Sequence, residues 1–115
     1  MDNTFIEGYD EIVNYYGYWP SFHDDLINKI KITSSKIEFY IIQQSFSEEL
    51  NNNSKIKLTF SEVKDFNLEG ELLGCLSIIL DIEFQMINGI IETQVSSSLG
   101  ARGTIHSNKV KFEFE

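Results

Sequence analysis

A long alternation of apolar and polar residues, followed at once by a turn sequence, constrains this chain most. In residues 76–87 apolar side chains recur at every second position, and Ile79 interrupts the polar positions. A helix would place Asp81 and Glu83 among apolar residues, so the pattern predicts a strand. Asn88-Gly89 is a preferred sequence for a two-residue hairpin turn, and residues 90–96 predict the returning strand. The residues expected on one face are Leu76, Ile78, Leu80, Ile82, Phe84 and Met86.

Shorter alternating stretches predict the rest of an antiparallel sheet. These further strands are expected at residues 26–33, 36–44, 55–60, 104–106 and 109–115, and Val63, Phe66 and Leu68 continue the third of them less regularly. Ser34-Ser35 and Ser107-Asn108 are expected to be turns. Residues 97–103 are expected to be a loop, and the polar residues 45–54 a mobile one.

Residues 5–16 predict the one helix, because their apolar side chains fall at helical spacing. Asn3 or Thr4 is expected to cap its start, and Gly17 to end it in a left-handed conformation. Pro20 then prevents the helix from resuming. The apolar stripe consists of Phe5, Tyr9, Ile12, Val13 and Tyr16.

Together these elements predict a single α+β, β-rich domain over residues 1–115. Its short N-terminal helix (about residues 5–16) would pack on a curled or two-layer antiparallel sheet of about seven or eight strands. Residues 17–25 form the joint between the two parts, and residues 26–115 the β-rich body. The aromatic residues near the joint are expected to be core, with Phe5, Trp19 and Phe22 buried and Tyr15 or Tyr18 outside.

The chain is acidic, with a formal net charge of −9 from 18 acidic and 9 basic residues. This charge argues against binding to nucleic acid or to an anionic membrane. It would attract a basic protein partner, or serve only to keep the domain soluble. The lone Cys75 lies among leucines and is expected to be an inert buried thiol, as in a reducing cytosol. The N-terminus has no positively charged or apolar leader, so a cytoplasmic protein is expected.

His23-Asp24-Asp25 is the cluster that suggests catalysis or metal binding. A histidine beside acids can act as a base or as a metal ligand, and His106 is the other histidine. Adjacent side chains on a strand point in opposite directions, however, and no further ligand spacing is present. The preferred interpretation is that these polar residues satisfy backbone donors at the joint. We therefore expect no metal, no cofactor and no enzymatic activity.

Residues 18–24 read Tyr-Trp-Pro-Ser-Phe-His-Asp. This stretch resembles the opening motif of the Imm50 family of bacterial immunity proteins. The chain is also similar to that family in its short N-terminal helix and in the string of strands that follows. The resemblance implies an inhibitor that binds and neutralises a cognate toxin domain in the cytosol, and it transfers no catalytic residue. The motif residues are Trp19, Pro20, Ser21, Phe22, His23 and Asp24.

An acidic surface would suit a basic toxin domain such as a nuclease. The acids proposed to contact it are Asp24, Asp25, Glu48, Glu49, Asp65 and Glu69. Two alternatives stay open. One is a small metal-dependent or His/Asp hydrolase that uses His23, Asp24 and His106. The other is a self-associating structural module that pairs through residues 110–114 as a free strand edge. As an inhibitor, the chain is expected to be a monomer or a weak homodimer.

Overall fold

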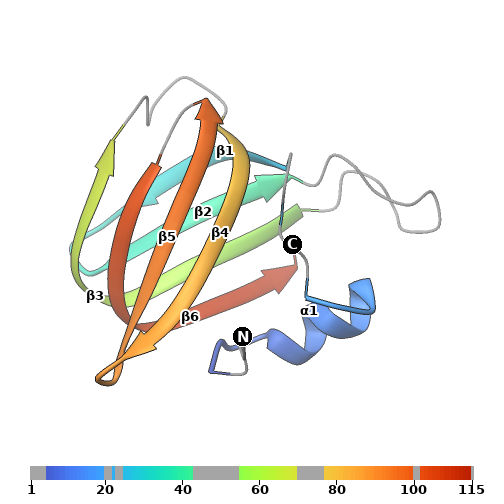
Figure 1. Ribbon diagram of the computed structural model, residues 1–115, viewed down its shortest axis with the longest axis horizontal. Helices are drawn as coiled ribbons and strands as arrows, with labels where there is room; N and C mark the ends of the chain where they lie inside the picture. The colour runs from blue at the N-terminus through green and yellow to red at the C-terminus, as the bar shows by residue number, and fades with distance from the viewer. Residues whose placement is uncertain are drawn as a thin grey trace.

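The computed structural model describes residues 5–19, 22, 25–42, 55–69, 77–99 and 102–114 (Figure 1). Within these ranges the chain forms one helix and six strands, α1 (Tyr9–Tyr16), β1 (Leu26–Ile32), β2 (Lys36–Ile42), β3 (Lys55–Glu69), β4 (Ser77–Ile87), β5 (Ile90–Leu99) and β6 (Arg102–Phe114). The fold is α+β, β-rich and antiparallel, as predicted, but it has six strands instead of seven or eight. None of the helical residues described forms a segment long and apolar enough to cross a membrane.

The sheet has the strand order β1-β2-β3-β6-β5-β4 and curls back on itself. β4 meets β1 through two residue pairs, Leu26 with Ile78 and Ile27 with Ser77. The first half of β3 pairs with β2 and with the end of β6, whereas residues 63–69 pair with the beginning of β6. β3 and β6 therefore curve from one layer of the sheet to the other (Figure 1). Both layers bury their inner side chains in one core.

The strand count is lower than expected because residues 55–69 form one bent strand and residues 102–114 form another. Glu62 adopts a positive φ of 54°, and the pairing with β6 shifts between Val63 and Asp65, so β3 bends without ending. Ser107-Asn108 is likewise not a turn, because β6 stays paired with β3 on both sides of it. The Asn108 side-chain amide donates to Glu62 Oε1 at 3.0 Å and joins the two strands at this bend. The predicted loop at residues 97–103 is also mostly strand.

Of the three predicted hairpin turns, those at Ser34-Ser35 and Asn88-Gly89 are confirmed. Asn88 and Gly89 have φ values of 51° and 81°, the left-handed pair that a type I′ turn requires. The orientation of Ile79 was predicted wrongly, since it is fully buried. The pairing of β4 with β5 shifts on both sides of Ile79, which turns that side chain to the inner face together with Ile82. Met86, expected on the inner face, is 44% exposed near the hairpin end.

The helix begins later than predicted, because the residues before it pair with β6. The Glu7 amide donates to Val110 O, and the Phe112 amide donates to Glu7 O, both at 2.9 Å. Gly8, with φ 87°, then turns the chain into α1. Gly17 ends the helix in a left-handed conformation as predicted, with its amide donating to Val13 O at 2.6 Å. The proposed caps Asn3 and Thr4, residues 45–54 and Cys75 lie outside the described residues.

This pairing covers the strand edge on which the self-association hypothesis depends. Residues 110–112 of β6 pair with β3 on one side and bond to Glu7 on the other. Val110 and Phe112 are also almost fully buried, at 2% and 1% exposure. This part of β6 is therefore no free edge.

Candidate functional site

The described part of the family-like motif is built into the core. Trp19 stacks on Tyr9 with ring centroids 5.3 Å apart, and meets Phe112 edge-on at 5.4 Å. Phe22 is 3% exposed and stacks on Phe112 at 5.3 Å. Phe22 is thus buried in the core beneath α1 as predicted, whereas Trp19 and Phe5, also expected to be buried, are only partly buried against that core. Tyr18 is 59% exposed. Pro20, Ser21, His23 and Asp24 of the motif lie outside the described residues.

The chain then makes a tight joint into β1. Phe22 has a positive φ of 62°, and its carbonyl accepts a hydrogen bond from the Asp25 amide at 3.0 Å. The Asp25 carbonyl in turn accepts from the Ile79 amide at 2.9 Å, which joins the turn to β4. Asp25 is 4% exposed, so it offers almost no surface to a partner, contrary to its expected place among the contact residues. Of the other acids named for that surface, Asp65 and Glu69 are exposed on β3, and Asp24, Glu48 and Glu49 lie outside the described residues.

A polar cluster of the described surface is centred on His106, whose strand β6 lies between β3 and β5. His106 on β6 is directly opposite Asp65 on β3 and Glu92 on β5. Its Nδ1 lies 2.6 Å from Asp65 Oδ1, and its Nε2 lies 3.0 Å from Glu92 Oε2. In its protonated form the imidazolium donates one hydrogen bond to each carboxylate. The cluster therefore ties β3, β6 and β5 together across the outer face of the sheet.

The hydrogen bond to Asp65, then that to Glu92, raises the pKa of His106 above its ordinary value, against a smaller opposing effect of burial. A histidine that acts as a general base needs one ring nitrogen free to accept a proton. Here both nitrogens face carboxylates, so the arrangement suits a held cation better than a base. The other proposed catalytic residues, His23 and Asp24, are outside the described residues, and the described residues hold no group of three or more His, Cys, Asp or Glu that suits a metal.

The raised pKa of His106 predicts a pH-dependent contribution to stability. An unfolded histidine titrates near pH 6.5, so the stabilisation should be complete below about that pH and should be lost as pH rises through the higher folded pKa. The side chain is 34% exposed, so we expect less than about 1 kcal/mol. Urea unfolding between pH 6 and pH 9 should show wild type losing this increment while His106→Gln does not. Parallel pH curves for the two proteins would contradict the prediction.

Charges are divided between the two outer faces of the molecule. Five acids point outward from β4, β5 and the second half of β3, which together with the first half of β6 form one surface that we call the acidic face. Its acids are Asp65, Glu69, Asp81, Glu83 and Glu92, and the cations of the same region are Lys64, Arg102 and His106. Because the inner sides of both layers share one core, the acidic face points away from the layer of β1 and β2.

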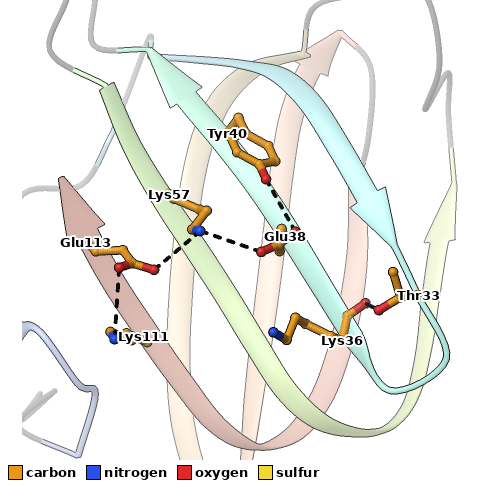
Figure 2. Close-up of polar contacts among 7 residues, drawn as sticks. All are labelled: Thr33, Lys36, Glu38, Tyr40, Lys57, Lys111 and Glu113. Carbon is orange, nitrogen blue, oxygen red and sulfur yellow. Dashed lines mark hydrogen bonds and ion pairs between the residues drawn. The ribbon is translucent and has the colours of Figure 1, made fainter. Parts of the chain in front are cut away.

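The opposite outer face, made by β1, β2, the first half of β3 and the second half of β6, is rich in lysine. This lysine face carries Lys29, Lys31, Lys36, Lys55, Lys57, Lys109 and Lys111, seven of the nine basic residues of the chain. Figure 2 shows Lys57 between Glu38 and Glu113, at 3.7 and 3.6 Å. The lysine face is thus mixed and internally paired, whereas most of the described acid excess lies elsewhere, on the acidic face and on α1.

A shallow hollow of about 90 Å³ marks the acidic face between β4 and β5. Its lining residues are Glu83, Phe84, Gln85, Glu92 and Gln94. The Gln94 side-chain amide donates to Glu92 Oε1 at 3.4 Å, and the second oxygen of Glu92 meets His106. Ile87, on the same side of the hairpin as Gln85, is 40% exposed at the edge of this surface.

The sequence alone did not identify Glu92, Asp81 or Glu83 as residues of a candidate contact surface. The Asn88-Gly89 turn sets the register that pairs Glu92 with Gln85, so the β4–β5 part of this surface could have been found. The meeting of Glu92, His106 and Asp65 could not, because it depends on β6 lying between β3 and β5.

No family model matches the chain, and no curated protein is significantly similar to it.

Proposed function

We propose that this chain is an immunity protein that binds and neutralises a cognate bacterial toxin domain, with the acidic face as its binding surface. The observation that carries the binding part is the division of charge, which leaves five outward acids on one face of a sheet. The toxin part rests on the resemblance of residues 18–24 to the Imm50 motif. A basic toxin domain, such as a nuclease, would be drawn to this face both by the net charge of −9 and by the local acids.

The size of the surface is compatible with this proposal. A stable protein complex buries about 800 Å² on each partner. The acidic face extends over four strands, and the exposed Ile87 at its edge offers an apolar contact beside the acids. The buried position of Phe22 and the partly buried position of Trp19 against the core support a structural role for these two motif residues, with contact to the toxin made elsewhere.

The direct test is to co-express the toxin domain encoded beside this chain, with and without the chain, and to titrate the two purified proteins at two salt concentrations. The proposal expects survival only with the chain present, and tight binding that weakens as salt rises. No protection and no binding at either salt concentration would refute this pairing.

Charge reversal locates the surface. The double variant Glu69→Lys/Glu83→Lys is expected to slow toxin association about tenfold or more at low salt, because it removes steering acids from the acidic face. The matched control is Glu62→Lys/Glu113→Lys, which changes the net charge equally but lies beside lysines. Stopped-flow association rates should fall far more for the first variant. Equal rates for the two variants would show that net charge alone acts and that the acidic face is not the binding surface.

A further inference from the structure

His106 lies within the surface that the proposed function assigns to the partner. It shares Glu92 with the hollow between β4 and β5, since Glu92 lines the hollow and also lies 3.0 Å from the His106 ring. Glu83 lines the same hollow from β4. A cationic group that enters the hollow would therefore compete with protonated His106 for the Glu92 carboxylate.

The groups around His106 make this competition electrostatic. Asp65 faces the ring from β3, where Lys64 is its neighbour in the chain, and Glu92 faces it from β5. On its own strand the outward neighbours Thr104 and Asn108 are uncharged. Two carboxylates thus hold one imidazolium charge, and they are the same type of ligand that a guanidinium or an ammonium group would seek.

We propose that the hollow beside His106 takes an arginine or lysine side chain of the partner, and that its docking on Glu83 and Glu92 expels the proton from His106. The inference rests on the proposed function, which identifies the acidic face as the binding surface. It adds which chemical group of the partner is recognised there and how the binding of that group depends on pH. Coupling of two ligands is reciprocal. Protonation of His106 therefore lowers the affinity for the docked cation by the same factor as docking lowers the affinity of His106 for its proton. Docking of the cation should therefore be tighter at pH 8 than at pH 6.

The test uses the full chain and a hexa-arginine peptide, with the ring signals of the two histidines followed by NMR. Comparison with His23→Gln assigns the His106 signal. Saturating peptide should lower the midpoint of the His106 titration by about half a pH unit or more. The peptide affinity should rise severalfold between pH 6 and pH 8, with about tenfold per pH unit as the ceiling for one proton.

Two variants sharpen this experiment. His106→Gln should bind the peptide with an affinity that is flat over the same pH range. Glu83→Gln removes a carboxylate of the hollow that no hydrogen bond joins to His106 among the described contacts, and should weaken peptide binding severalfold. Circular dichroism would confirm that both variants are folded.

Failure of the inference is distinct from failure of the proposed function. A peptide that does not bind at low salt, or that binds without moving the His106 titration, overturns the inference even if the chain protects cells from its toxin. A peptide that binds with the expected shift upholds the inference even if the neighbouring toxin domain proves not to be the partner.

Discussion

Gly8→Ala is expected to destabilise the protein by about 3 kcal/mol. A Cβ atom at this position would overlap the carbonyl oxygen of Phe112, which belongs to the backbone and has no rotamer with which to move away. The left-handed φ of 87° costs a residue other than glycine about 1–2 kcal/mol, and backbone displacement to relieve an overlap adds about 1–3 kcal/mol. The added methyl group would push residues 6–8 off β6, whose amide and carbonyl groups Glu7 satisfies.

Gly17→Ala provides the matched control. Gly17 has nearly the same φ, 84°, but nothing lies within 4 Å of a Cβ built on it. Its substitution should therefore cost only the conformational part, about 1–2 kcal/mol. Chemical denaturation of the two variants measures the difference directly. Equal free energies of unfolding would show that the contact of Gly8 with Phe112 does not limit the fold.

Phe22→Ala is expected to cost about 3–5 kcal/mol, the usual range for removing a buried phenylalanine side chain. Its ring is 3% exposed and lies parallel to Phe112 at an interplanar angle of 7°. The ring also meets Trp19 edge-on, so its loss opens a cavity under the motif. Thermal or urea unfolding gives the magnitude.

Tyr18→Ala, in the same motif, is the comparison for Phe22→Ala. Tyr18 is 59% exposed, and its substitution should change stability by no more than about 0.5 kcal/mol. At a temperature where the Phe22→Ala variant is still folded, this variant should bind the toxin domain as wild type does, since its acidic face is unchanged. A loss of binding by folded Phe22→Ala would instead place the motif in the interface.

Local signals in the sequence predicted the elements of this fold well, and strand pairing lay beyond them. The Asn88-Gly89 turn and the strict alternation of residues 55–60 each follow from backbone and side-chain preferences within a few residues. Ser107-Asn108 was mistaken for a turn because small polar residues also occur where a strand bends, and only the pairing with β3 distinguishes the two. Ile79 was misplaced for a related reason, since a bulge changes the period of two.

The candidate site was predicted in character and only partly in position. The net charge indicated an acidic surface, and Asp65 and Glu69 do lie on it. Asp25 was misassigned because its polarity gave no sign that it would be enclosed at the joint. The role of His106 depends on Asp65 and Glu92, residues far from it in the chain, and no pattern in one sequence brings such residues together.

The place of β6 in the sheet also determines when this protein can fold. β6 follows the other five strands in the chain, yet lies between β3 and β5, so without it the hairpin of β4 and β5 has no pairing to β3. The backbone amide and carbonyl of Glu7 likewise gain their hydrogen-bonding partners only when β6 has been made. Such non-local pairing is slow, on the order of milliseconds to seconds for β proteins. Until β6 emerged from the ribosome, the β4–β5 hairpin would be joined to β1, β2 and β3 only through the two residue pairs between β1 and β4. The native structure would then form in one cooperative step once β6 was made.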